Sequence, residues 1–214
     1  MGQLDQTHFL PLLDKVGIYD SIQATSHYSI TRDLDGLRAA LLRWSTTTHI
    51  FIAPWGEFTI TLEDVKCLFK LPSFGVVDVT SCALSNSEKL TLDYLIGVNR
   101  KLSKGPRKKT NFACWTRFFF KSSDSVLGDG FGKELELAGF ITFWLSQYMF
   151  STITEDCLNE FCFSMPVKLA RGKQIALALI FLGTLCWHLD RLVTDIVRTG
   201  GCYLVLSSIN SAFL

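Results

Sequence analysis

The chain of 214 residues has almost no net charge, because 21 lysines and arginines are balanced by 20 aspartates and glutamates. A surface field of one sign, typical of proteins that bind nucleic acid or another polyanion, is therefore absent, and any such contact must be local. Charged residues make up only 19% of the sequence, whereas hydrophobic residues make up 48%. This composition is the opposite of that of disordered chains and predicts a folded protein.

The sequence also lacks the cysteine pattern of a disulfide framework or a zinc site. Its seven cysteines are an odd number with irregular spacing, and no C-x-x-C pair occurs. The N-terminus has neither the basic nor the apolar region of a secretory signal peptide. The simplest interpretation is reduced thiols in the cytosol or nucleus, most of them buried as small hydrophobic side chains.

Long apolar runs are missing as well. The longest, residues 175–189, has fifteen residues, includes glycine, threonine and histidine, and is bounded by charged residues. A membrane-spanning helix needs about 20 apolar residues, so this run is more typical of a buried core helix. We expect no membrane association, although the positive mean hydropathy of +0.26 leaves a membrane helix open as an alternative.

No complete catalytic motif is present. There is no G-x-S-x-G elbow, no protease cysteine signature and no P-loop, and the glycines at 128–132 lack the spacing of a phosphate-binding loop. The four histidines are scattered, and Cys186 and His188 would point to different faces of a helix. We therefore expect no metal and no cofactor, while an enzyme whose site is assembled from distant residues stays open.

Hydrophobic periodicity predicts a mainly α fold, a helical domain with a small β-hairpin near residues 49–60. Residues 17–32 are expected to be mostly loop, and the aromatic patch at 115–120 fits either helix or strand. The long helix at 175–196 is expected to have a buried first half. Helices are expected over residues 10–16, 33–44, 62–71, 92–102, 137–148, from 154 onward and over 175–196.

The hairpin and the helix behind it are predicted to form one unit. Two β-branched and aromatic segments flank Pro54, Trp55 and Gly56, and Thr61 then begins a capping box with Asp64. Gly56 permits the turn, Trp55 would plug the hairpin against the helix, and Glu57 would accept hydrogen bonds. A helix-turn-helix beginning at this helix is less favoured, because no basic second helix follows it.

The strongest charge feature is a basic run of six cations without an acid among them: Arg100, Lys101, Lys104, Arg107, Lys108 and Lys109. Clustered cations gain free energy by releasing counterions from a polyanion, so this run fits a nucleic-acid patch or a nuclear-localisation signal. A solvated linker is the third interpretation, because Gly105-Pro106 marks a loop. No internal repeat is visible, and we expect a single domain over residues 1–214 in which residues 100–133 are loop-rich.

Four short motifs occur in order between residues 34 and 75: R-W, T-H-x-F, P-W-G-E and T-L-E-D-V. Together they resemble the plant mobile domain, the "aminotransferase-like" domain shared by retrotransposon-encoded proteins and the cellular MAIN and MAIN-like proteins. The similarity is looser over residues 143–151 and 175–201. A folding role is favoured over a binding role for the motif residues, which are Trp44, His49, Phe51, Pro54, Trp55, Gly56, Glu57, Leu62 and Asp64.

The resemblance implies a mostly helical nuclear protein with a role in transposon silencing, genome stability and meristem development. It also implies a protein partner, either phosphatase-like or chromatin-associated. No aminotransferase chemistry is expected, because no Schiff-base lysine with a phosphate cup can be placed. The prediction is thus a non-enzymatic protein-interaction module, and the alternative is a nucleic-acid-binding protein derived from a mobile element that uses residues 100–109. Relatives usually continue past the position of Leu214, so the chain is expected to be truncated at its C-terminus.

Overall fold

The computed structural model describes residues 6–28, 33–78, 83–103, 109–120, 131–151 and 157–198. Within these ranges the chain forms nine α-helices and a three-stranded antiparallel sheet of order β1-β2-β3. The predicted fold class, mainly α with a small hairpin, is confirmed. The elements are α1 (Gln6–Lys15), α2 (Tyr19–His27), α3 (Leu34–Leu41), β1 (Trp44–Ser45), β2 (Ile50–Ala53), β3 (Gly56–Phe58), α4 (Leu62–Phe69), α5 (Asn86–Leu102), α6 (Phe112–Phe120), α7 (Phe131–Trp144), α8 (Ser164–Leu169) and α9 (Leu177–Arg198).

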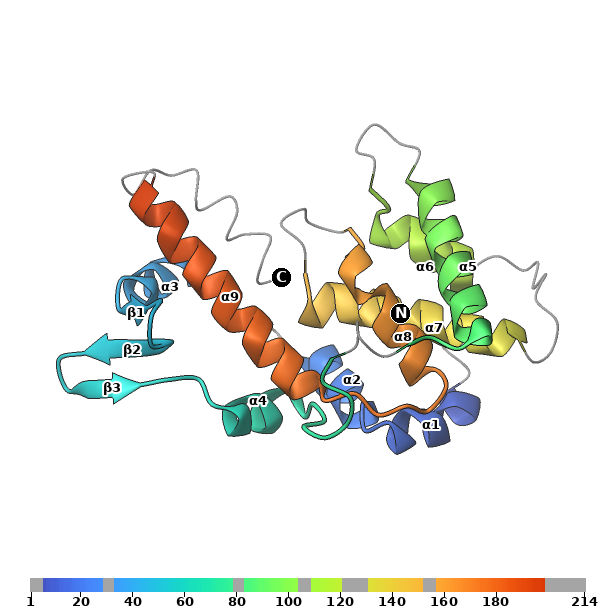
Figure 1. The fold of residues 1–214 in the computed structure, drawn as a ribbon, viewed down its shortest axis with the longest axis horizontal. Coiled ribbons are helices and arrows are strands. Elements are labelled where there is room, and N and C mark those ends of the chain that lie inside the picture. The colour runs from blue at the N-terminus through green and yellow to red at the C-terminus, as the bar shows by residue number, and fades with distance from the viewer. Residues whose placement is uncertain are drawn as a thin grey trace.

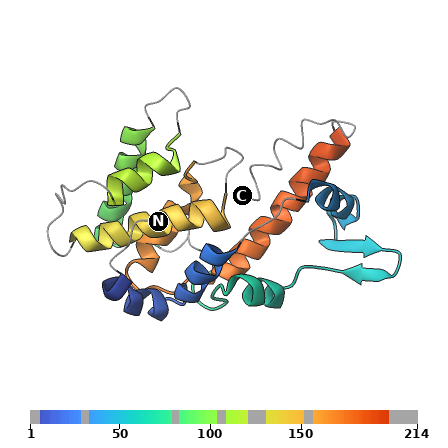
Figure 2. The ribbon, with the colours of Figure 1, turned by 180° about the vertical axis from the view of Figure 1, so that it is seen from behind.

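Helix α9 links two parts of unequal size (Figures 1 and 2). The large lobe contains α1, α2, α4 to α8 and the first turns of α9, which share one hydrophobic core. The small lobe contains α3 and the sheet, which pack against the C-terminal half of α9 around a second, smaller core. The sheet therefore lies far from α5 and α6, at the opposite end of the molecule (Figure 1).

Two buried tryptophans organise the large lobe. Trp115 of α6 donates its indole N–H to the carbonyl of Gly139 at 2.9 Å, and Trp144 of α7 donates to the hydroxyl of Thr25 at 3.0 Å. A buried indole needs such a partner because an unsatisfied N–H is costly in an apolar core. At Gly139 a Cβ would lie only 2.7 Å from the ring of Phe119, so glycine allows α6 and α7 to approach closely.

The predicted hairpin and capping box are both confirmed. In the hairpin Phe51 pairs with Phe58 and Ile52 with Glu57. The backbone N–H of Thr61 donates to Asp64 Oδ2 at 2.8 Å, while the backbone N–H of Asp64 donates to Thr61 Oγ1 at 3.2 Å. The side-chain and backbone hydrogen bonds from Thr61 lower the pKa of Asp64.

The helix predicted over 33–44 is shorter than expected. Asp33 caps it as predicted, since its Oδ1 accepts from the backbone N–H of Gly36 at 2.8 Å, but α3 ends at Leu41. Trp44 lies in β1 and pairs with Phe51. The helical spacing of Trp44 was a coincidence, because strand pairing and packing against α9 determine its conformation.

Helix α2 lies where a loop was predicted. Its sequence shows no helical apolar periodicity, because its buried positions are occupied by Ser21 and Thr25 rather than by aliphatic residues. Their hydroxyls are satisfied by backbone carbonyls: Ser21 Oγ donates to Lys70 at 2.7 Å, and Thr25 Oγ1 donates to Ser21 at 3.0 Å. Polar side chains with such partners can be buried at little cost.

Within the segment 100–133, which was predicted to be loop-rich, the described residues include the end of α5, all of α6 and the start of α7. The aromatic patch belongs to α6, and Gly132 lies inside α7, while residues 128–130 lie outside the described residues.

The helix predicted from residue 154 onward is replaced by shorter elements in the described residues. Thr154, the predicted cap, lies outside the described residues, and Phe161 belongs to a single 3-10 turn, Glu160–Phe163. After α7 the chain continues in a π-helical turn, Leu145–Met149.

The first half of α9 is less buried than predicted. Leu177 and Ala178 are buried, but Leu179 is exposed, and Ile180 to Leu182 are only partly covered. The reason is that α9 leaves the large lobe after its first turns and is then covered along one face. Among the described helices, α9 is the one with the length and composition that could cross a membrane, a test that core helices also pass.

Candidate functional site

Two of the family-motif residues, Trp44 and His49, contact one carboxylate of α9, that of Asp190. The indole Nε1 of Trp44 donates to Asp190 Oδ1 at 2.7 Å, and the imidazole Nε2 of His49 lies 3.0 Å from Asp190 Oδ2. Trp44 precedes Asp190 by 146 residues in the sequence. Both carboxylate oxygens therefore hold the small sheet against the long helix, and we call Trp44, His49 and Asp190 the clamp.

Aromatic contacts extend the clamp across the inner face of the sheet. The ring of Trp44 stacks on His49 with centroids 5.9 Å apart and meets the edge of Phe51 at 4.8 Å. Phe51 in turn stacks on Phe58 at 5.1 Å. Trp44 and Phe51 are buried against Leu189 and Leu192 of α9. Rings of this kind contribute packing energy beyond the area they bury.

His49 adopts a left-handed backbone conformation with φ of 55°. Such a φ is uncommon outside glycine, and surrounding contacts must hold it. The backbone N–H of His49 donates to Ser45 O at 2.9 Å, and Thr59 Oγ1 donates to His49 O at 2.7 Å. The T-H-x-F motif thus builds the turn that directs His49 toward Asp190.

The P-W-G-E motif lies at the free tip of the hairpin. Trp55 is 79% exposed, so the predicted plug against α4 is wrong. Gly56 has φ of 145°, which explains the glycine at this turn. The side chain of Glu57 is exposed and, in the described part of the chain, accepts no hydrogen bond, contrary to prediction. Pro54 is exposed as well.

Three large apolar side chains of the hairpin remain uncovered: Ile52 at 54% exposure, Trp55 at 79% and Phe58 at 49%. We call them the tip surface. Ile52 and Phe58 point to opposite faces of the hairpin, because side chains alternate along strands and Phe51, the cross-strand partner of Phe58, faces α9. They are exposed because the hairpin projects beyond α9 (Figure 1). The remaining motif residue, Leu62, is partly buried against the large core.

The basic run is divided by the structure. Arg100 and Lys101 occupy the last turn of α5, and Lys109 is exposed just before α6. Lys104, Arg107 and Lys108 lie outside the described residues. The described cations are thus displayed mainly on a helix rather than on a linker.

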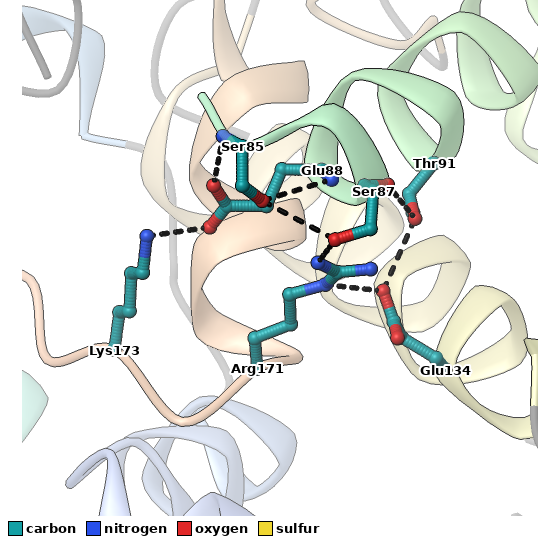
Figure 3. A network of polar contacts seen from close by, with 7 residues as sticks. All are labelled: Ser85, Ser87, Glu88, Thr91, Glu134, Arg171 and Lys173. Carbon is teal, nitrogen blue, oxygen red and sulfur yellow. Dashed lines mark hydrogen bonds and ion pairs between the residues drawn. The ribbon is translucent and has the colours of Figure 1, made fainter. Parts of the chain in front are cut away.

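The ionisable groups of the large lobe form a structural network that joins α5, α7 and the segment after α8 (Figure 3). Arg171 Nε donates to Glu134 Oε1 at 2.7 Å and also contacts the hydroxyl of Ser87. Glu134 Oε1 accepts a further hydrogen bond from Thr91 Oγ1 at 3.1 Å. These bonds fix the N-terminal turns of α5 on the body of the lobe.

The second half of the network is an ion pair between buried Glu88 and Lys173, with Nζ 2.7 Å from Oε1. The backbone N–H of Ser85 donates to Glu88 Oε2 at 2.7 Å and completes a capping box. Burial alone would raise the pKa of Glu88, but Lys173 and the two Ser85 bonds outweigh it and lower the pKa to about 2. Glu88 therefore stays ionised as a structural anion.

The other side chains with shifted pKa values do not come together as a reaction centre within the described ranges. Burial raises the pKa of Cys162 and, together with the charge of Asp190, that of Cys186, so neither thiol is a ready nucleophile. Burial lowers the pKa of His188, and the positive charge of Arg191 lowers it further. No three His, Cys, Asp or Glu side chains of the described residues lie close enough to hold a metal ion.

The fold and its site define a helical domain that carries a small aromatic sheet clamped to its longest helix. The family model of the plant mobile domain matches residues 17–210. The chain therefore belongs to the plant mobile domain family, as its motifs predicted. No curated protein and no solved structure matches it.

Sequence reasoning missed Asp190 as the centre of the clamp. Leu185, Leu189 and Leu192 predict the buried stripe of α9, and Asp190 directly follows one of these positions. The position of Asp190 beside this apolar stripe is the only sequence signal for its role, and no neighbouring residue indicates that Trp44 and His49 are its partners.

Proposed function

We propose that the chain is a non-enzymatic protein-interaction module of the nucleus, acting in transposon silencing, genome stability and meristem development. Family membership supports this role. The partner we propose is a phosphatase-like or chromatin-associated protein. The single observation that carries the binding role is Trp55, a conformationally simple aromatic side chain presented almost entirely to solvent.

A tryptophan of this exposure suits a binding anchor. Single exposed apolar residues are normal on soluble proteins, whereas this hairpin carries three large ones, with Ile52 and Phe58 on opposite faces and Trp55 at the turn. Tryptophan is enriched among residues that dominate interface energy, because it buries a large area while ordering few rotatable bonds. The clamp adds rigidity, so the tip surface would be ordered before the partner binds.

The non-enzymatic part of the proposal rests on how the motif's polar groups are used. Both oxygens of Asp190 bind the sheet, and the carboxylate of Asp64 caps α4. A general acid or base needs a free position toward a substrate, and these carboxylates are engaged in holding the fold. The predictions of no cofactor and no metal remain part of this proposal.

The test compares Trp55→Ala with Leu90→Ala, which removes an apolar side chain 64% exposed on α5. Each tagged full-length chain is expressed in plant cells, and the nuclear extract is probed for a defined phosphatase-like protein. We expect the wild type and Leu90→Ala to retain this protein and Trp55→Ala to lose at least about nine tenths of it, since anchor residues contribute 2 kcal/mol or more.

Equal recovery with all three chains would exclude the tip surface as the binding site. A fluorescent fusion of the full chain tests the location, and we expect the signal in the nucleus. Exclusion from the nucleus would contradict the proposal as a whole. Steady turnover of a substrate by the purified chain would contradict its non-enzymatic part.

A further inference from the structure

A second surface lies at the other end of the molecule, where α5 ends and α6 begins (Figure 1). Thr110 Oγ1 donates to the carbonyl of Asn99 at 2.9 Å. Arg100 follows Asn99 in α5, and Lys109 precedes Thr110, so this buried hydrogen bond holds the backbone segments that carry these two cations close together. Lys101 is the next residue of the same helical turn.

Helix α6 contributes a fourth cation. Nζ of Lys101 lies 6.0 Å from the centroid of the Phe118 ring, which brings the C-terminal turn of α5 against α6. Arg117 is adjacent to Phe118 and its side chain is exposed. We call Arg100, Lys101, Lys109 and Arg117 the basic surface.

The dipole of α5 explains only two of the four cations of the basic surface. Cations in the last turn offset the negative end of a helix dipole, which explains Arg100 and Lys101 but neither Lys109 nor Arg117. An acid also lies at this end of α5, since Glu160 Oε1 accepts a hydrogen bond from Asn99 Nδ2 at 2.9 Å. Its carboxylate is partly engaged in this hydrogen bond.

We propose that the basic surface binds the sugar–phosphate backbone of duplex DNA without reading its base sequence. Lysine and arginine on a fixed helical frame neutralise phosphates and release counterions, which supplies sequence-independent affinity. Although the whole chain is nearly neutral, the field at this end is locally positive. The site lies away from the tip surface and is independent of the proposed protein partner.

The neighbouring side chains favour duplex DNA over two other polyanions. A membrane surface would require exposed apolar side chains next to the cations, yet Leu102 and Phe118 are packed against the large core. Single-stranded nucleic acid would require aromatic rings free to stack on bases, and Phe118 to Phe120 are each partly buried.

The experiment titrates a fluorescent DNA duplex with the purified full chain between about 50 and 200 mM salt. In Arg100→Ala/Lys101→Ala/Arg117→Ala we expect at least a tenfold loss of affinity at the lower salt. We also expect a decrease of about 2–3 in the slope of log affinity against log salt, because each lost phosphate contact removes about 0.9. Arg117→Ala alone should lower the slope by about 1.

The matched control is Arg38→Ala/Arg43→Ala/Arg198→Ala, which removes the same charge from exposed positions around the small lobe. It should keep the wild-type slope, and the melting temperatures of both triple variants should agree with that of the wild type. Equal slopes for the two triple variants would overturn the proposal, as would no binding by the wild type at low salt.

Tighter binding of single strands or of acidic lipid vesicles than of the duplex would also overturn the proposal. Trp55→Ala should bind DNA like the wild type. The proposal of DNA binding and the proposal of a protein partner can therefore be contradicted independently of each other.

Discussion

The two lobes of this protein are stabilised in different ways. The large lobe has an extensive apolar core that includes two fully buried tryptophans, whereas the core of the small lobe has five buried apolar residues, one of which is Trp44. A small core buries too little surface to be stable alone. The small lobe therefore depends on α9 and on one carboxylate, and the comparison shows that a polar clamp can hold an element whose core is small.

The largest expected effect comes from the core of the large lobe. Trp115→Ala should lower the free energy of unfolding by about 3–5 kcal/mol, because it leaves a large cavity and deprives the Gly139 carbonyl of its donor. Urea unfolding followed by circular dichroism measures this change. Trp187→Ala, at an exposed position of α9, should cost less than about 1 kcal/mol, and equal losses would contradict the core assignment.

Asp190→Ala should act on the small lobe alone. The change leaves the Trp44 indole without its acceptor and removes the contact of His49, which costs about 1–3 kcal/mol. Hydrogen exchange should accelerate over residues 44–58 while α7 keeps its protection. Asp190→Asn, which retains an acceptor oxygen, should have the smaller effect. Uniform acceleration in both lobes would show that they unfold as one unit.

Acid should weaken the large lobe through Glu88. The carboxyl has a pKa of 4.5 in its ordinary state and of about 2 in the fold, so the unfolded chain binds more protons between these values. The stabilisation is thus fully present above a pH of about 4.5 and is lost as the pH falls toward 2.

The measurement is the urea midpoint at several pH values for the wild type and Glu88→Gln. The wild type should lose about 1–3 kcal/mol more than the variant across this window. Glu63→Gln, at an exposed position of α4, should behave like the wild type. If the urea midpoints of the wild type and Glu88→Gln depended on pH in the same way, Glu88 would not be the source of the acid sensitivity.

The smallest effect is expected at Gly183 of α9, and Gly139 of α7 provides the contrast. Around Gly183 of α9 a Cβ would meet nothing within 4 Å, so Gly183→Ala should stabilise the fold by about 0.5–1 kcal/mol through helix propensity. Gly139→Ala should destabilise it, because the new Cβ would clash with Phe119. Thermal melts of both variants test the contrast, and a destabilising Gly183→Ala would indicate packing on α9 in solution.

Local signals in the sequence were sufficient for several elements. Asp33, the Thr61–Asp64 capping box and the turn at Gly56 were predicted because each is determined by residues within a few positions. Trp55 was misjudged, since an aromatic residue in a motif was assumed to be buried. Helix α2 was missed, because its buried hydroxyls follow no apolar pattern.

The sequence by itself determined the helical class, the hairpin, the helix caps and the family, because these depend on spacing and short motifs. Only the tertiary structure decided that Trp44 and His49 meet Asp190, that Trp55 faces solvent and that Lys101 of α5 lies over Phe118 of α6. The physical reason is distance along the chain, since each arrangement depends on which helices pack together. Side-chain exposure follows from that packing, and no local pattern encodes it.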